Sequence, residues 1–373
     1  MKILTVGCGY VGSVLSRRLS ERFPSAEIIV SDADKKAIEK ASSSIGRNDV
    51  RFLQIDFSDH ERLVEVARGC DVMVGLTPGR LGYEMMKVAI GARVDMVDLS
   101  YMAEDPLSLG QEASEAGIRI VPDCGVAPGL SNVIVGRAAS MLDEVKDVAI
   151  LVGGLPQEAV PPLGYKVTWC VEDLIEEYVR KAKIVKGGKT VEVEALDGLE
   201  EVEFPGVGKL EAFYTDGVRT LHSTVKAENM WEKTMRYPGH AEKVKTLRML
   251  GFFDEQPIEG VSPRFLTGKL LERKLGYPDV KDLVAMKVYV SGLKGGKNKS
   301  YTYYLLDRYD EEEGVSAMGR TTAYTASAAI ELLAGGLVEE KGVIPPEKLG
   351  MDGRIYREIM ARLGMEGIVV EEA

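Results

Sequence analysis

The sequence predicts an α/β protein in which a doubly wound, parallel-sheet domain is followed by a second, mixed α+β domain. First, the chain has 373 residues, more than the roughly 100 to 200 residues of one ordinary domain. Second, short apolar runs alternate with helical patterns through the first third of the chain, which is typical of a parallel sheet covered by helices on both faces. Third, from about residue 145 the sequence includes strands that have one polar face.

The first domain is expected to contain six strands separated by helices whose apolar positions lie three and four residues apart. The strands are expected at residues 2–6, 27–31, 50–54, 71–75, 94–98 and 118–121, and the helices at 10–22, 34–44, 60–68, 80–90 and 108–116.

The second domain is expected to mix helices and strands. Residues 284–290 alternate between apolar and polar side chains, as in a strand with one solvated face. Further strands are expected within 182–213 and 299–309, and helices near 131–142, 171–180 and 239–250. A helix that begins after Thr321 or Thr322 is expected to return to the first domain. We therefore expect a first domain of residues 1–125 with about 321–373, and a substrate-binding and dimerisation domain of residues 126–320.

A glycine-rich turn follows the first expected strand. Gly7, Gly9 and Gly12 have GxGxxG spacing, and Asp32 lies 32 − 12 = 20 residues further on. This is the Rossmann dinucleotide-binding pattern: the glycines permit a tight turn and close approach of a pyrophosphate, and the acid meets ribose hydroxyls. A carboxylate at position 32 would repel the 2′-phosphate of NADP, so the sequence favours NAD. The cofactor contacts are expected from Gly7, Gly9, Tyr10, Val11, Gly12 and Asp32.

Other cofactor contacts are expected where later strands end, because ligands of open α/β sheets lie outside the carboxyl ends of the strands. Asp56 is placed near the adenine, or alternatively caps the next helix. Leu76, Thr77 and Pro78 are expected beneath the nicotinamide, or alternatively form a simple strand-to-helix turn. Cys124 is expected beside the nicotinamide as a small packing residue.

Composition excludes several other classes of function. Lys and Arg number 47 and Asp and Glu 58, so the net charge is 47 − 58 = −11, which disfavours nucleic acids and anionic membrane surfaces as partners. The four cysteines include no CxxC pair and there are three histidines. We therefore expect no metal site, no disulfide framework and a reducing, cytoplasmic location. No segment has the length and apolarity of a membrane span, and Met1 is expected to begin the mature fold.

Six sequence blocks resemble the family of saccharopine reductases and lysine 6-dehydrogenases. They are VDLSY (97–101), VPDCGVAPGLSN (121–132), GYKVTW (164–169), YTDGVRTL (214–221), KTMRYPGH (233–240) and GRTTAYTAS (319–327). The resemblance implies an NAD(P)-dependent oxidoreductase that acts on an amino acid and forms a homodimer or homotetramer. In saccharopine reductases Pro-Arg-Gly tends to follow a Trp-Ser pair at this place, whereas Cys-Val-Glu-Asp follows Trp169 here.

Acids therefore stand where a cation would meet a second carboxylate, and they suit a substrate with a free amino end. This favours NAD-dependent L-lysine 6-dehydrogenase, which oxidises the ε-carbon of lysine to an aldehyde and releases ammonia. The alternatives are a saccharopine reductase, a carboxynorspermidine dehydrogenase-like enzyme that uses NAD(P), and an NAD-binding sensor without turnover. The substrate amine needs a base, because its unperturbed pKa is near 10.4.

Site residues are expected in the same blocks. Asp123 and Lys166 are the alternative bases; Asp123 could instead cap a helix, and Lys166 could reach solvent. Tyr101 is expected to orient the amine, or alternatively is an aromatic residue of an interface, and Trp169 is expected to line the substrate site. Arg219 and Arg236 are expected to bind the α-carboxylate, the alternative for each being a surface ion pair.

Overall fold

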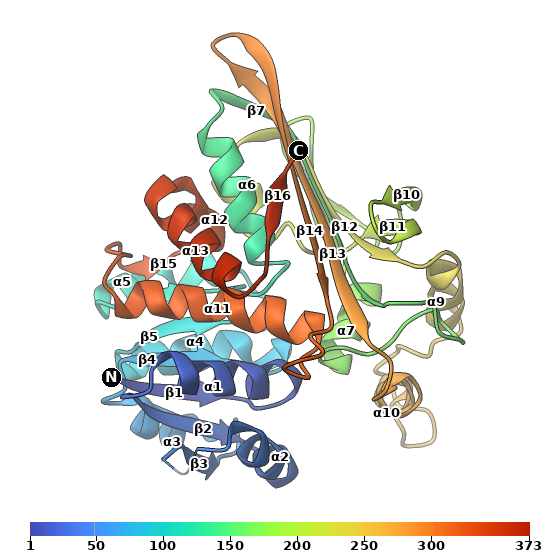
Figure 1. Ribbon diagram of the computed structural model, residues 1–373. Helices are drawn as coiled ribbons and strands as arrows, with labels where there is room; N and C mark the ends of the chain where they lie inside the picture. The colour runs from blue at the N-terminus through green and yellow to red at the C-terminus, as the bar shows by residue number, and fades with distance from the viewer. Residues whose placement is uncertain (48) are drawn as a thin grey trace. The chain divides into compact units, whose positions relative to one another are not determined.

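The computed structural model describes residues 1–47 and 49–373, which form two compact units (Figure 1). Unit 1 contains Met1–Arg137 and Gly319–Gly367, and unit 2 contains Ala138–Met318 and Ile368–Ala373. One unit has a parallel sheet and the other a mixed sheet, so the predicted α/β fold class is confirmed.

In the described residues, unit 1 contains a seven-stranded parallel sheet in the order β15-β6-β5-β4-β1-β2-β3. The six strands expected from the sequence are present, and β15 is added by the returning C-terminal part. The strands are β1 (Lys2–Val6), β2 (Glu27–Asp32), β3 (Arg51–Gln54), β4 (Val72–Gly75), β5 (Asp95–Asp98), β6 (Arg119–Val121) and β15 (Gly342–Val343).

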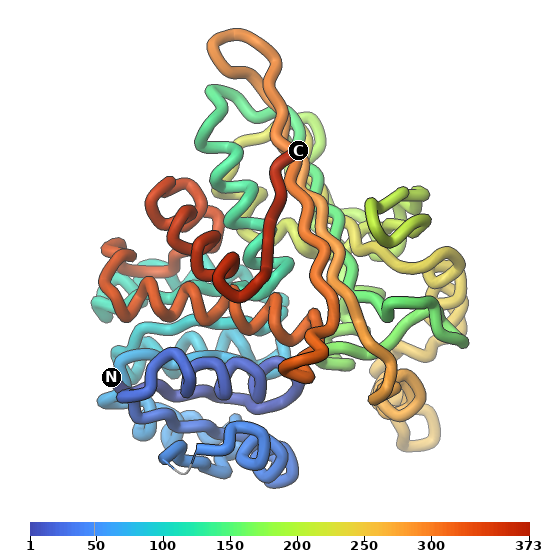
Figure 2. The backbone as a smooth tube through the Cα atoms, viewed as in Figure 1, coloured from blue at the N-terminus to red at the C-terminus, as the bar shows by residue number. Residues whose placement is uncertain are grey.

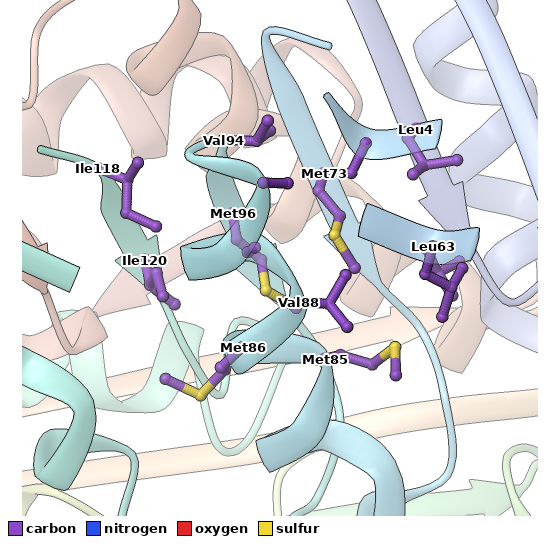
Figure 3. Packing of buried hydrophobic residues seen from close by; sticks show 14 of the residues in the cluster. Leu4, Leu63, Met73, Met85, Met86, Val88, Val94, Met96, Ile118 and Ile120 are labelled. Atoms are coloured by element: carbon purple, nitrogen blue, oxygen red, sulfur yellow. The ribbon is translucent and has the colours of Figure 1, made fainter. Parts of the chain in front are cut away.

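Helices follow the strands of unit 1 as the alternating pattern predicts. They are α1 (Tyr10–Arg22), α2 (Lys35–Ile45), α3 (His60–Ala67), α4 (Gly79–Ala92), the 3₁₀ helix η1 (Pro106–Leu109), α5 (Gly110–Glu115), α6 (Leu130–Ser140), α11 (Ala317–Ala334), α12 (Pro346–Met351) and α13 (Gly353–Met365). Figure 3 shows how α4 places Met85, Met86 and Val88 against Met73 of β4 and Met96 of β5. All five side chains are buried, and this burial fixes the strand ends that carry the candidate site.

In the described residues, unit 2 contains a nine-stranded sheet whose main path is β10-β11-β12-β7-β13-β14-β16, with β8 and β9 attached through β12. β12 runs parallel to β7, and the other pairs are antiparallel. The long β13–β14 hairpin is evident in Figure 2. The strands are β7 (Glu144–Pro156), β8 (Ala182–Lys186), β9 (Lys189–Val193), β10 (Glu200–Phe204), β11 (Gly208–Tyr214), β12 (Ala227–Arg236), β13 (Asp282–Lys294), β14 (Lys297–Arg308) and β16 (Val370–Glu372).

The helices of unit 2 include the ones expected near residues 171–180 and 239–250. They are α7 (Val171–Val179), α8 (Leu221–Thr224), α9 (His240–Met249) and α10 (Pro263–Leu275). Aromatic and aliphatic side chains of α7, α9 and β11, among them Tyr178, Val244 and Phe213, form a buried cluster.

The unit boundaries differ from the expected domain ranges. Most of α6 belongs to unit 1, whereas the expected first domain ended at residue 125. Residues 368–373 belong to unit 2, because β16 pairs with β14. The helix expected after Thr321 or Thr322 begins earlier, at Ala317, because the Asp282 carboxylate accepts hydrogen bonds from the Ala317 and Met318 amides at 2.9 and 3.0 Å.

Within the described residues, no helix combines the length and the apolarity that crossing a membrane requires.

Candidate functional site

The glycine-rich turn is built so that two of its glycines are irreplaceable and the third faces open space. Gly7 has φ +109°, and a Cβ there would lie 2.5 Å from the Leu76 carbonyl oxygen. A Cβ on Gly12 would lie 2.4 Å from the Gly7 carbonyl oxygen. At Gly9 an added Cβ would meet nothing within 4 Å. Gly7 and Gly12 therefore shape the turn, and Gly9 leaves room for a ligand to approach the backbone.

The turn leads into the N-terminus of α1. Gly9 is the N-cap residue of α1, and the backbone amides at the start of a helix point toward an anion placed at its N-terminus. Tyr10 is 49% exposed and Val11 is half-buried, and both belong to this first turn. A pyrophosphate fits here because the amides and the positive end of the helix dipole favour negative charge.

Asp32 lies at the end of β2 and joins that strand to the turn. Its Oδ2 accepts a hydrogen bond from the Cys8 amide at 2.7 Å, and its Oδ1 accepts one from the Asp34 amide at 2.9 Å. The side chain is buried. A carboxylate fixed beside the phosphate-binding turn is the arrangement that accepts hydrogen bonds from ribose hydroxyls.

The turn after β4 packs against the glycines. The Leu76 amide donates to the Val6 carbonyl at 2.9 Å, and Pro78 is the N-cap residue of α4. Thr77 is 4% exposed, and its Oγ1 has no hydrogen-bond partner among the described residues. Because a buried hydroxyl without a partner is unfavourable, this atom suits a polar group of a bound ligand. The residues of this region therefore fit a dinucleotide.

Asp56 stabilises the turn in which it lies. It is exposed, and its Oδ1 accepts hydrogen bonds from the Ser58 amide at 2.9 Å and from the Ser58 hydroxyl at 2.7 Å. These bonds lower the pKa of the Asp56 carboxyl. The alternative role as a helix cap is wrong, because Asp59 is the residue that caps α3.

The ends of β5 and β6 bring two buried carboxyl groups to the same thiol. Asp98 is fully buried and its Oδ2 accepts a hydrogen bond from the Ser100 amide at 3.0 Å. Asp123 is 1% exposed and has φ +50°. The Cys124 amide donates to the Asp98 carbonyl at 2.8 Å. Burial, together with the charges of Asp98 and Asp123, raises the pKa of the Cys124 thiol to about 12. Cys124 is thus a neutral packing residue. Tyr101, which follows β5, is also buried.

Lys166 does not reach freely into solvent. Its Nζ donates a hydrogen bond to the Val280 carbonyl. Partial burial lowers the pKa of its ammonium group, while the charges of Asp282 and Asp279 act in the opposite direction. Trp169 is partly buried against the α7–α9 cluster.

The two arginines expected to bind substrate both form buried ion pairs. Arg236 is 2% exposed, and its Nη2 donates to the Glu177 Oε2 at 2.7 Å while its guanidinium lies 4.7 Å from the centre of the Tyr165 ring. Arg219, with φ +52°, donates from Nη1 to the Asp216 Oδ2 at 3.4 Å. These are internal pairs rather than the surface pairs of the alternative interpretation.

His240 is a structural residue of the same region. It is fully buried, its Nδ1 lies 2.9 Å from the Leu163 carbonyl oxygen, and its Nε2 lies 3.1 Å from the Tyr178 Oη. The carbonyl requires a proton on Nδ1, so Nε2 accepts the tyrosine hydrogen. Burial, reinforced by the charge of Arg236, lowers the pKa of His240 to about 3.

One buried carboxyl group of unit 2 was not among the candidates. Glu232 on β12 is 3% exposed, and its Oε2 accepts hydrogen bonds from the Thr215 hydroxyl at 2.6 Å and the Gly217 amide at 3.1 Å. Thr215 and Gly217 lie in the YTDGVRTL block, so that block indicated the region but not Glu232 itself.

No group of three or more metal-ligating side chains occurs within residues 1–47 and 49–373.

Two family models match most of the chain. The one described as the saccharopine dehydrogenase NADP binding domain matches residues 3–121, and the one described as the saccharopine dehydrogenase C-terminal domain matches residues 125–368. Among solved structures, apo saccharopine dehydrogenase (L-Glu forming) from Saccharomyces cerevisiae matches with a TM-score of 0.79 and 20% identity, covering 100% of this chain and 99% of that one. That likeness concerns the fold.

Curated relatives are longer than this chain. The mitochondrial α-aminoadipic semialdehyde synthase of Bos taurus is 24% identical and aligns with 99% of this chain and 47% of its own length. The saccharopine dehydrogenase [NADP(+), L-glutamate-forming] of Saccharomyces cerevisiae is 28% identical and aligns with 68% of this chain and 58% of its own. The chain thus spans about half of these relatives. The two family models cover nearly its whole length, and the chain belongs to the saccharopine dehydrogenase family.

Proposed function

We propose that the chain is an NAD-dependent L-lysine 6-dehydrogenase, an oxidoreductase that acts on the C–N bond at the end of the lysine side chain. The observation that carries the cofactor choice is the Asp32 carboxylate, which two backbone amides hold beside the glycine-rich turn. A fixed negative charge there favours two ribose hydroxyls over a 2′-phosphate. The matching family model is named for NADP, so the cofactor is the first point to test.

Bound NAD would accept a hydride from the ε-carbon of lysine. The overall reaction converts R–CH2–NH2 and NAD to an iminium ion and NADH, and water then yields the aldehyde and ammonium. The chain's own residues have to remove a proton from the ε-ammonium group, because only the neutral amine can donate the hydride. Asp123 and Lys166 remain the proposed bases. The lowered pKa of Lys166 favours an amine that can accept a proton.

Two acids after Trp169 replace the cation that would meet a second carboxylate, and this replacement supports a substrate with a free amino end. Glu172 and Asp173 occupy the first turn of α7, where negative charge stabilises the helix N-terminus.

Saccharopine reduction with NADP is the second candidate, because the yeast relative is named for that reaction. The remaining candidate functions are a carboxynorspermidine dehydrogenase-like activity and an NAD-binding sensor without turnover. The family includes enzymes, and the buried carboxyl groups at the ends of β5 and β6 favour chemistry over sensing.

One assay separates these candidates. Purified protein is incubated with NAD or NADP and with L-lysine or saccharopine, and reduced cofactor is followed by absorbance. We expect NADH from NAD and L-lysine. In the same assay Asp32→Ala should raise the KM for NAD far more than the KM for lysine. Asp34→Ala is the matched control, because Asp34 caps α2 through the Lys36 amide. Turnover of saccharopine with NADP and none with lysine would replace the proposal by the second candidate.

We also propose that the chain forms a homo-oligomer and works in the cytoplasm. Large apolar side chains are exposed between the end of α9 and α10, including Met249 at 86%, Ile258 at 68% and Phe265 at 64%. Exposed apolar groups of this kind favour association. Light scattering after size-exclusion chromatography should show a dimer or tetramer, and Phe265→Glu should weaken it. A wild-type monomer would contradict this proposal.

A further inference from the structure

Glu232 lies on a face of β12 that carries polar side chains into the interior of unit 2. Side chains alternate along a strand, so Glu232, Thr234 and Arg236 share one face. All three are buried, with exposed fractions of 3%, 3% and 2%. Glu232 pairs in register with Ile150 of β7, which places it in the centre of the sheet rather than at an edge. A carboxyl group in such a place is costly unless a partner compensates it.

Hydrogen bonds from the described part of the chain reach one carboxyl oxygen of Glu232 and not the other. Oε2 accepts from the Thr215 hydroxyl and from the Gly217 amide. A Cβ on Gly217 would lie 2.6 Å from the Glu232 Cδ, so a larger residue there would displace the carboxyl group. Both hydrogen bonds go to Oε2, and none is found to Oε1 within residues 1–47 and 49–373. The carboxyl group is therefore oriented, with one oxygen left for another donor.

The neighbouring acids have cationic partners and Glu232 has none within residues 1–47 and 49–373. Glu177 pairs with Arg236 at 2.7 Å, and Asp216 pairs with Arg219 at 3.4 Å. Burial raises the pKa of Glu232 to about 8, and the charges of Glu177 and Asp216 act in the same direction. The hydrogen bonds from Thr215 and Gly217 oppose this rise. The fold therefore favours the neutral acid of Glu232 until a cation comes close to it.

Thr215 connects Glu232 to a second hydroxyl in a way that suits both protonation states. Its Oγ1 lies 2.6 Å from the Glu232 Oε2 and 2.7 Å from the Thr234 Oγ1. A threonine hydroxyl has one hydrogen. When Glu232 is ionised, Thr215 donates to it and accepts from Thr234. When Glu232 carries the proton on Oε2, it donates to Thr215, which donates to Thr234. The network therefore remains bonded when Glu232 gains or loses a proton.

We propose that Glu232 binds the terminal ammonium group of the amino-acid substrate and accepts a proton from it. This inference rests on the proposed function and names a third base beside Asp123 and Lys166. As the ammonium group approaches, Glu232 releases its own proton to the solvent and pairs with the ammonium as a carboxylate. In the step itself, an N–H bond of the ammonium breaks, an O–H bond to Glu232 forms, and the electron pair stays on nitrogen. The neutral amine that results is the species from which hydride can leave. A primary alkylammonium supplies a cation that can pair with the Glu232 carboxylate.

The decisive measurement is proton release on ligand binding. Because the fold favours the neutral acid of Glu232, pairing it with an ammonium group should release up to one proton to the buffer at pH 7. Calorimetric titration of the NAD-free protein with L-lysine in two buffers of different ionisation enthalpy measures this release. We expect it for wild type and not for Glu232→Gln, which keeps the shape and an acceptor oxygen. L-Norleucine, which lacks the terminal amine, should release no proton.

Glu211→Gln is the matched control. Glu211 is also a buried carboxyl group of the same sheet, but it accepts from the Gly239 and Ala241 amides at 2.8 and 2.6 Å at the start of α9. It should keep the wild-type proton release. In turnover, Glu232→Gln should lower kcat/KM for lysine by about 100- to 10,000-fold, the range for loss of a general base. Glu232→Asp should restore part of both the activity and the proton release.

The outcomes separate this inference from the proposed function. Equal proton release in wild type and Glu232→Gln overturns the role of Glu232, even if wild type oxidises lysine. Release with L-norleucine equal to that with lysine overturns the assignment to the terminal amine. If wild type neither binds nor oxidises lysine, the proposed function fails, and titration with n-pentylammonium tests Glu232 separately: release that depends on Glu232 supports it, and its absence refutes it.

Discussion

Replacing Glu232 by glutamine should change how the stability of unit 2 depends on pH. The ordinary pKa of a glutamate carboxyl is 4.5, and burial raises that of Glu232 to about 8 in the folded protein. A raised pKa means that the fold favours the neutral acid. The contribution of this group to stability is therefore complete below pH 4.5, falls as the pH rises, and is lost above pH 8. Glutamine stays neutral throughout and has no such loss.

The size of the effect follows from the shift. One pKa unit corresponds to about 1.4 kcal/mol, so the free energy of unfolding of wild type should fall by about 1.4 kcal/mol per pH unit relative to Glu232→Gln between pH 5 and 8. The whole difference amounts to roughly 3 to 5 kcal/mol. Glu177 and Asp216, whose charges raise the pKa of Glu232, are present in both proteins.

Tryptophan fluorescence makes this measurement specific to one unit. The chain has two tryptophans, Trp169 and Trp231, and both belong to unit 2. Urea unfolding at pH 5, 6, 7, 8 and 9 gives the free energy of unfolding of each protein. Glu211→Gln should follow the wild-type pH dependence. Parallel curves for wild type and Glu232→Gln would show that Glu232 is ionised in the fold at neutral pH, and the electrostatic reason for its role would be refuted.

Four further predictions rest on other parts of the structure. Gly12→Ala should abolish NAD binding measured by nucleotide fluorescence, because its Cβ would lie 2.4 Å from the Gly7 oxygen, whereas Gly9→Ala should fold normally and only weaken binding; equal binding by both would contradict the geometry of the turn. Glu177→Gln should lower the free energy of unfolding by about 3 to 5 kcal/mol, since it leaves Arg236 buried without its partner, while Glu176→Gln, at 23% side-chain exposure, should cost at most about 1 kcal/mol. Iodoacetamide at pH 8 should label the folded protein slowly by mass spectrometry, because burial raises the pKa of Cys70 to about 11 and of Cys8, Cys124 and Cys170 to about 12; rapid labelling of any of them before unfolding would argue against this. Nuclear magnetic resonance should find His240 neutral from pH 8 down to pH 5, since its pKa is about 3, and titration of its ring near pH 6.5 would be the contrary result.

Most of unit 1 could be predicted because its sequence carries regular local signals. Strands such as β1 and β4 are short apolar runs, and the helices between them have apolar positions at helical spacing. The glycine spacing of the turn and Asp32 were also visible, because the φ of Gly7 and the close approach of Gly12 leave only glycine at those positions. The strand β15 could not be expected, since it consists of two residues far along the chain.

The middle of the unit 2 sheet was missed for a physical reason. β12 has the sequence AENMWEKTMR, in which charged residues occur on both faces of the strand, so no apolar alternation identifies it. The strand is buried all the same, because Lys233 pairs with Glu200 at 2.7 Å on one face and Arg236 pairs with Glu177 on the other. Partners distant in sequence satisfy these charges, and such pairing cannot be read from periodicity.

The same dependence on distant partners explains why the sequence pointed to Arg236 and not to Glu232. Arg236 was selected for its charge and its sequence block, yet the fold supplies a carboxylate for it; Glu232, four residues earlier, was overlooked although the fold supplies no cation for it. A buried charge that already has a partner has little further affinity to offer a ligand, whereas an oriented carboxyl group without one gains most when a cation arrives. An oriented, buried carboxyl group without a cationic partner therefore indicates the substrate better than a residue whose type alone matches the expected substrate. For unit 2 that criterion selects a ligand with a positive charge, which is the property that distinguishes the lysine side chain from a second carboxylate.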